Sequence, residues 1–313
     1  WVDAELIQRG RDDPWVGTAR EFDRAEAHLV LPAVQHFPDR QLHRASTCPS
    51  RSKERPVDVE ERDDDLHRAN VAGAAFRSRL GRLMDLDLLA KLPLWLAAFL
   101  LSLTCHEAAH ALVGKLGGDS TAASQVTLDP LPHIRREPFG TLVVPILSFV
   151  LQGGGWMIGW ASAPYDPSWA KNHPRRAAGM AAAGPAANFA LAVIAALGMR
   201  AGIAAGYFEL PAGGISLDTL VVAPGGVAQG LALFCSVLFS VNLILGCFNL
   251  IPLPPLDGYA IVPLVLNDRM RAKWFDLFSG GGALMGLIIA WVLFDRLMPP
   301  VFRTAIGLLY TGV

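Results

Sequence analysis

Long apolar runs separated by short polar loops dominate the chain from about residue 90 onward. The runs cover residues 92–113, 141–161, 177–204, 227–250 and 283–298. A helix needs roughly 20 mostly apolar residues to cross a bilayer, and only helices or closed barrels can span it. We therefore predict an all-α polytopic membrane protein, built as a helical bundle.

The first part of the chain lacks this pattern. Residues 1–91 hold 32 of the 55 charged side chains, and residues 1–83 show no sustained apolar period. The first methionine is Met84, directly before the apolar region. We expect residues 1–83 to be a charged leader, disordered or foreign to the native protein, and residues 84–313 to form the membrane domain. The alternative is a soluble N-terminal domain.

Charge and cysteine content exclude two other classes of protein. The net charge is −1, and no clustered basic surface is evident, so the sequence gives no case for a nucleic-acid partner. The four cysteines have neither CxxC nor disulfide-framework spacing, which argues against a cysteine metal site.

His106, Glu107 and His110 form an HExxH motif in the C-terminal half of the first apolar run. On a helix, residues i and i+4 share a face, so both imidazoles can bind one metal ion with Glu107 beside them. Zinc in such a site polarises a peptide carbonyl and lowers the pKa of water to about 7, and a carboxylate can then accept the proton. Because ionisable residues inside an apolar span are costly and usually functional, we predict Zn²⁺ as the cofactor.

A third protein ligand is expected, because catalytic zinc commonly has three and keeps one position open. The best candidate is Asp257, the only acidic residue between Asp218 and Asp268. It follows a proline-rich stretch at residues 252–255 that cannot continue a regular helix. Irregular backbone at membrane depth is tolerated where it lines a cavity. The alternative is that Asp257 merely ends a turn before Gly258.

Three motifs follow one another in the apolar segments. They are HExxH at residues 106–110, Gly-Pro-Ala-Ala-Asn at 184–188, and a stretch from Asn249 that ends in Leu256-Asp257-Gly258. In this order they resemble the site-2 protease family of intramembrane zinc metalloproteases. Residues 119–122 and 128–134 also resemble a subgroup of small bacterial members, which carry no PDZ or CBS domain.

The resemblance implies a function and roles for single residues. His106, His110 and Asp257 would be the zinc ligands, and Glu107 the catalytic base of a zinc metalloprotease. Its substrate would be a membrane protein, hydrolysed in or near a transmembrane segment within the lipid bilayer. The enzyme itself would be a multi-pass integral protein of the bacterial inner membrane.

Three further polar residues have open roles. The amide of Asn188 could stabilise a developing oxyanion, as amide donors do elsewhere, or form a hydrogen bond between helices. Asn249 could fix the proline-rich turn or touch the substrate. For His133 the sequence favours an ordinary surface-loop histidine over an additional metal contact or a group that supports a metal ligand.

The HExxH and Asp257 motifs can meet only if the helices that carry them run parallel. A full crossing by residues 141–161 would make those helices antiparallel, so we predict that Gly153, Gly154 and Gly155 turn this segment into a re-entrant hairpin. We also expect a short β-like stretch at residues 125–128, with which an unwound substrate strand could pair.

This topology gathers nine cationic residues on the face to which the HExxH helix leads, and the positive-inside rule then makes that face cytoplasmic. They are Lys115, Arg135, Arg136, Lys171, Arg175, Arg176, Arg269, Arg271 and Lys273.

A second class of function uses the same ligands: a non-proteolytic membrane protein that binds or transports zinc. Glu107 argues against it, because metal binding alone has no need of a carboxylate between the two histidines.

Overall fold

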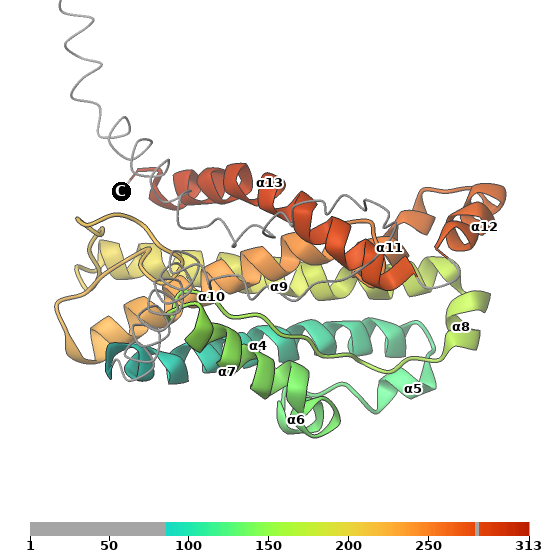
Figure 1. Cartoon of the computed structure of the whole chain (residues 1–313), viewed down its shortest axis with the longest axis horizontal. Helices are drawn as coiled ribbons and strands as arrows, with labels where there is room; N and C mark the ends of the chain where they lie inside the picture. Colours follow the sequence, from blue (N-terminus) through green and yellow to red (C-terminus); the bar gives the residue numbers. More distant parts are fainter. Residues whose placement is uncertain (1–85, 279–281, 313) are drawn as a thin grey trace, which may run out of the picture. The chain divides into compact units, whose positions relative to one another are not determined.

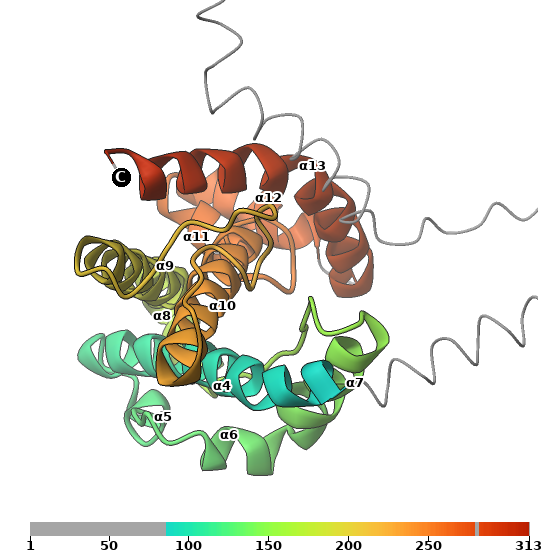
Figure 2. The ribbon, with the colours of Figure 1, turned by 90° about the vertical axis from the view of Figure 1, so that its left-hand side faces the viewer.

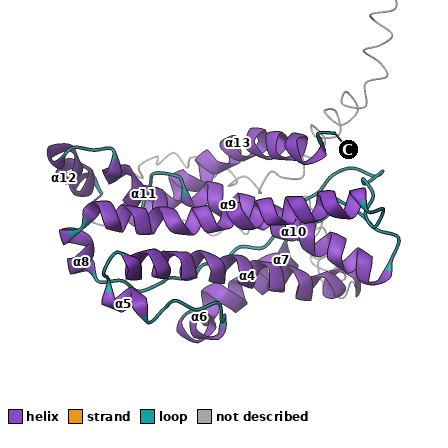
Figure 3. Ribbon diagram, turned by 180° about the vertical axis from the view of Figure 1, so that it is seen from behind, coloured by secondary structure: helices purple, strands orange, loops and turns teal. Residues whose placement is uncertain are grey.

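The computed structural model describes residues 86–278 and 282–312, so the prediction for residues 1–83 lies outside the described part of the chain. Within that part, helices joined by loops make up the protein (Figure 3). Four of these helices are long and apolar enough to cross a membrane, which confirms the predicted all-α polytopic class. They are α4 (Leu86–Leu116), α9 (Pro174–Ala204), α10 (Gly226–Asn249) and α13 (Gly282–Tyr310).

Shorter helices occupy the connections between these spans. They are α5 (Ser120–Ala123), α6 (Leu131–Arg136), the π-helix η1 (Phe139–Val143), α7 (Val144–Leu151), α8 (Pro167–Asn172), α11 (Asp257–Ile261), the 3₁₀ helix η2 (Val262–Leu264) and α12 (Asp268–Leu277). Residues 125–128 form no strand and belong to the loop between α5 and α6. The predicted β-like edge is therefore irregular backbone.

Helices α4, α9 and α10 pack against one another, and α9 contacts both of the others (Figure 2). Its buried positions are mostly small residues, such as Ala181, Gly184, Ala192 and Ala195. Small residues let helix backbones approach closely, which drives association in lipid, where there is little hydrophobic force between spans. Helices α4 and α10 run in one direction and α9 in the other, so the C-terminal ends of α4 and α10 lie at the same end of the bundle (Figure 1).

The segment after α6 doubles back as the sequence predicted. Helix α7 ends at Leu151, and Gly153 and Gly154 then adopt positive φ angles of 71° and 84°, which glycine tolerates best. The returning chain is extended, and the backbone N–H of Trp160 donates to the carbonyl of Gly140 at 3.0 Å. Figure 1 shows this extended segment leading to α8, at the end of the bundle where the C-terminal end of α4 lies. The predicted reversal of the chain at these glycines is thereby confirmed.

Aromatic packing fixes this hairpin against the first span. Trp95 and Phe99 of α4 are each 1% exposed, and the rings of Trp95 and Phe149 lie 5.6 Å apart between centroids. Aromatic pairs at this separation contribute about 0.5–1.5 kcal/mol beyond the area that they bury.

Helix α13 extends to Tyr310, twelve residues past the predicted end of the last apolar run. Pro299 and Pro300 lie inside it and bend it rather than end it, and Figure 2 shows it in two differently directed parts. Its C-terminal end is held by Arg200 of α9, which donates to the carbonyls of Leu309 (2.6 Å) and Thr311 (2.9 Å).

The N-terminal half of α13 crosses the proline-rich turn that follows α10. A Cβ atom on Gly286 would lie 3.2 Å from the carbonyl carbon of Pro254 and closer still to its oxygen. Only glycine therefore allows the last span to lie directly on this turn.

Candidate metal centre

The HExxH residues lie on the buried face of α4. His106, Glu107 and His110 are only 6%, 5% and 8% exposed. His106 precedes the C-terminal end of α4 by ten residues, which corresponds to roughly 15 Å along the helix axis. The motif is thus well inside a helix that is apolar enough to span a membrane.

Asp257 reaches the same point from the far side. Helix α10 ends at Asn249, the chain turns through the prolines, and α11 starts at Asp257 itself. A Cβ atom on Gly258 would lie 2.6 Å from the carbonyl carbon of Ile251, so the start of α11 packs directly on the backbone of the turn. This close approach sets the position of the Asp257 carboxylate.

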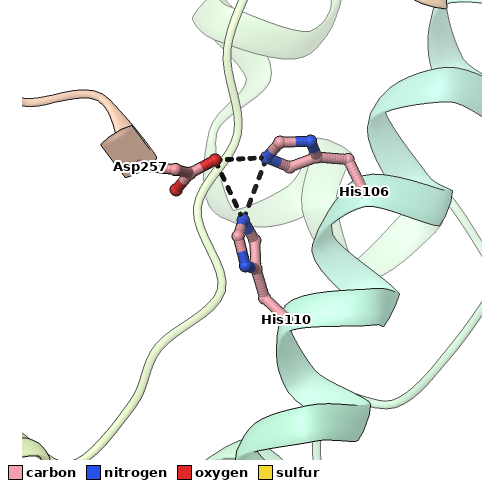
Figure 4. Close-up of side chains that lie close together, drawn as sticks. All are labelled: His106, His110 and Asp257. Carbon is pink, nitrogen blue, oxygen red and sulfur yellow. Dashed lines mark hydrogen bonds and ion pairs between the residues drawn. The ribbon is translucent and has the colours of Figure 1, made fainter. Parts of the chain in front are cut away.

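The three side chains converge on one small space (Figure 4). The Nε2 atoms of His106 and His110 are 2.9 Å apart, and Oδ2 of Asp257 lies 3.1 Å from the first and 3.4 Å from the second. Ligand atoms about 2.0–2.1 Å from a tetrahedral zinc ion would be roughly 3.3 Å from one another. Among the described residues, these three form the group that could hold a metal ion.

Outer hydrogen bonds aim both histidines at this space. Nδ1 of His106 lies 2.6 Å from Oδ1 of Asn188, and Nδ1 of His110 lies 2.7 Å from the carbonyl of Met180. Both acceptors require a proton on Nδ1, which leaves a lone pair on each Nε2. Oδ2 of Asp257 is buried and accepts no hydrogen bond within the described residues. Two lone pairs and a carboxylate oxygen that face one another fit a divalent cation.

Gly184 of α9 makes room for the pair of histidines. A Cβ atom at this position would lie 2.6 Å from Nε2 of His106 and closer still to Nε2 of His110. Gly184 therefore has a direct structural role: because it has no side chain, α9 leaves space for the two histidines of α4.

A cavity of about 1370 Å³ adjoins the cluster. Glu107, both histidines and Asp257 line it together with the extended residues 158–165 of the hairpin, and it reaches Phe275 of α12 and Trp291 of α13. Residues 125–128 are not among its lining. The Glu107 carboxylate thus faces the same space as the three metal-binding side chains.

The three residues with open roles have different surroundings. Asn188 is fully buried, and its Nδ2 donates to Oδ1 of Asn242 (2.8 Å) and to the carbonyl of Ser102 (3.4 Å). This geometry fits the hydrogen bond between helices, and the oxyanion role stays a prediction. Asn249 lines the cavity and donates to the carbonyl of Leu245 at 3.1 Å.

His133 is not the surface histidine that the sequence favoured, because only 3% of it is exposed. It lies in α6, outside the metal-binding group. Burial and the nearby Arg136 lower the pKa of His133, so the ring is neutral at pH 7. This burial cannot be predicted from the sequence, because α6 is a short polar segment between longer apolar runs.

Sequence reasoning also missed Ser102 and Asn242, which are both fully buried beside Asn188. A serine and an asparagine inside apolar runs are the available signal, since polar groups in a span commonly pair across helices. The sequence cannot tell which helix face they occupy.

A bundle of membrane-crossing helices with HExxH on one span and a carboxylate supplied by a later turn defines a membrane metalloprotease. Residues 94–293 match Peptidase family M50, and the chain belongs to this family of site-2 proteases. The matched region contains every residue of the metal-binding group. The protein is accordingly an integral membrane zinc metalloprotease with Zn²⁺ as its cofactor.

Two bacterial relatives agree with this assignment. The chain is 34% identical over 211 residues to the "Putative zinc metalloprotease YwhC" of Bacillus subtilis (strain 168), covering 66% of this chain and 82% of the relative. It is 33% identical over 181 residues to the "Putative zinc metalloprotease Rip2" of Mycobacterium tuberculosis, covering 56% of this chain and 59% of that protein. It thus spans less than two thirds of Rip2. No solved structure matches the chain.

Proposed function

We propose that this protein is an intramembrane zinc metalloendopeptidase that hydrolyses peptide bonds in or near transmembrane segments of other membrane proteins. His106, His110 and Asp257 hold the zinc ion, and Glu107 is the catalytic base. The observation that carries the proposal is the meeting of these four side chains at the wall of one cavity, three of them on the buried face of a helix that is apolar enough to cross a membrane.

Each residue has a defined task in this reaction. Zinc bound by the three ligands supplies a Lewis acid that polarises the scissile carbonyl and acidifies water. The Glu107 carboxylate accepts one proton from the attacking water as its oxygen bonds to the carbonyl carbon. Glu107 then gives this proton to the nitrogen as the C–N bond breaks, which yields one carboxyl and one amino terminus.

The substrate must unwind before it can react, because a transmembrane helix hides its carbonyls in its own hydrogen bonds. The extended residues 158–165 line the cavity, and they replace residues 125–128 as the edge along which an unwound strand would lie. Main-chain pairing of this kind holds peptides on exposed edges elsewhere.

A comparison of the wild type with Glu107→Gln tests the proposal. Purified full-length protein in detergent is incubated with a panel of single-span membrane proteins, and zinc is measured in both preparations. We expect about one zinc ion per chain in both, and cleavage reduced by about 10²–10⁴-fold in the variant, the usual contribution of a general base.

Two results would contradict it. Cleavage at the wild-type rate by Glu107→Gln would remove Glu107 from the reaction. Equal zinc binding by both, with cleavage of no substrate by either, would favour the zinc-binding or transport function that uses the same ligands.

A further inference from the structure

Three polar side chains form a buried chain of hydrogen bonds behind His106. They come from three spans, Ser102 from α4, Asn188 from α9 and Asn242 from α10, and each is 0% exposed. Asn242 lies outside the three sequence motifs. Its hydrogen bonds go to Asn188, Ser102 and Leu238, and not to the metal-binding residues. Its connection to the metal runs through Asn188.

The direction of every hydrogen bond in this chain is determined. The hydroxyl of Ser102 donates to the carbonyl of Ala98 at 2.6 Å, so its oxygen must accept from Nδ2 of Asn242 at 2.8 Å. The second hydrogen of that amide goes to the carbonyl of Leu238, also at 2.8 Å. Since a side-chain amide has two donors on one end and an acceptor on the other, Oδ1 of Asn242 must point to Asn188.

This orientation is passed on to the histidine. Nδ2 of Asn188 donates to Oδ1 of Asn242 at 2.8 Å, so Oδ1 of Asn188 faces Nδ1 of His106 at 2.6 Å. An acceptor at that place holds the proton on Nδ1 and keeps the lone pair on Nε2, where the metal binds. Two main-chain carbonyls, of Ala98 and Leu238, therefore fix the tautomer of His106 through three side chains.

We infer that Asn242 is a positioning residue of the metal centre: it holds the Asn188 amide in the one orientation that makes Nε2 of His106 a zinc ligand. Without Asn242 the Asn188 amide loses its short hydrogen bond and keeps only the long one to the carbonyl of Ser102 at 3.4 Å, so that it can rotate by half a turn. Its Nδ2 would then donate to Nδ1 of His106 and move the proton to Nε2, where it blocks the metal. The inference rests on the proposed ligand set.

The primary test is the affinity of the full-length protein for zinc, measured by competition with a chelator. Asn242→Leu keeps a side chain of similar volume and removes both donors and the acceptor. We expect its dissociation constant for zinc to rise by about 10–100-fold, the usual effect of losing an outer partner of a metal-bound histidine. Unchanged affinity would overturn the inference.

Ser236→Ala is the matched control on the same helix. Ser236 is also 0% exposed, and its hydroxyl donates to Ala232 while accepting from the backbone of Leu220 and Val221. It has no link to the histidines. This variant should lower the melting temperature of the metal-free protein and leave the affinity for zinc unchanged. An equal loss of affinity here would mean that Asn242 acts only through stability.

Testing Asn242→Leu in the Asn188→Asp variant distinguishes a role in orienting the Asn188 amide from a role in helix packing. In Asn188→Asp, both oxygens of the new carboxylate can accept from Nδ1 of His106, so the amide orientation no longer matters. Adding Asn242→Leu should then cause no further loss of zinc affinity, and should even relieve repulsion between the carboxylate and Oδ1 of Asn242. A loss as large as in the wild-type background would contradict the inference.

These measurements also tell the inference apart from the proposed function. If His110→Ala retains wild-type zinc affinity, the ligand assignment is wrong. If His110→Ala loses zinc while Asn242→Leu keeps it, the ligand assignment stands and Asn242 has no positioning role.

Discussion

Gly184 of α9 lies so close to His110 of α4 that any side chain on it would enter the space in which the metal-binding atoms meet. The backbone of α9 therefore lies directly against the imidazole rings of both histidines. This contact explains why a glycine precedes the proline in the middle of a span, at a place where glycine otherwise weakens a helix.

Gly184→Ala should strongly weaken zinc binding. The added methyl group would lie 2.6 Å from Nε2 of His106, so the two helices would have to separate and the ligand triangle would open. We expect zinc affinity to fall by at least about 100-fold, since even a 1 Å misplacement in a site is costly. Chelator competition measures this.

Gly179→Ala is the matched control, because it lies in the same helix and a Cβ there has no neighbour within 4 Å. It should retain zinc and gain about 0.5–1 kcal/mol of helix stability. Zinc loss in both variants would show that replacing either glycine of α9 disturbs the helix, whatever its distance from the histidines.

Gly258→Ala should separate Asp257 from the two histidines. The new Cβ would overlap the backbone of Ile251, and the start of α11 would move to relieve the overlap. We expect zinc affinity to fall by about 10-fold or more and cleavage by about 10²-fold. Zinc content and cleavage by purified protein provide the readout, and full retention of both would refute the structural role of this glycine.

The ion pair of Lys91 and Asp218 should make stability depend on pH at the opposite end of the bundle. Their charged atoms are 2.7 Å apart, with Lys91 43% and Asp218 10% exposed. Burial alone raises the pKa of Asp218, but hydrogen bonds from Lys91 and Ser216 outweigh it and leave the pKa below its usual value. A carboxyl with a lowered pKa stabilises the folded state above its unfolded pKa of about 3.9 and loses that contribution as the pH falls through the folded value.

Asp218→Asn should therefore lower the free energy of unfolding by about 1 kcal/mol at pH 7, a modest figure because Lys91 is solvated. The difference from wild type should shrink as the pH falls below the unfolded pKa of about 3.9, and it should vanish once Asp218 is protonated in the folded state as well. Melting curves in detergent across this range measure the effect. Glu209→Gln, an exposed acid of the same loop, serves as control and should leave the melting temperature unchanged.

The orientation of the bundle can be tested by labelling. We expect Ser124→Cys, on the exposed loop after the HExxH helix, to react with a membrane-impermeant reagent only from the cytoplasmic side. Ala212→Cys, on the exposed loop between α9 and α10, should react only from the other side. The native cysteines are replaced first, and the reverse pattern would invert the orientation.

The sequence predicted those features that depend on hydropathy, spacing and connectivity. HExxH spacing placed two histidines on one face, and the requirement that α4 and α10 run parallel predicted the hairpin at the three glycines. It could not predict helix rotation, so the chain of Ser102, Asn188 and Asn242 went unseen. It also misjudged His133, because the burial of a short polar helix depends on neighbours far away in the chain.

The C-terminal half of α4 and the turn after α10 form the metal centre together, and α13 lies on that turn at Gly286. About 150 residues of chain separate His110 from Asp257. A growing chain therefore has its two histidines in the bilayer long before their third partner has been synthesised. The three metal-binding side chains can therefore meet only after the turn that follows α10 has been synthesised.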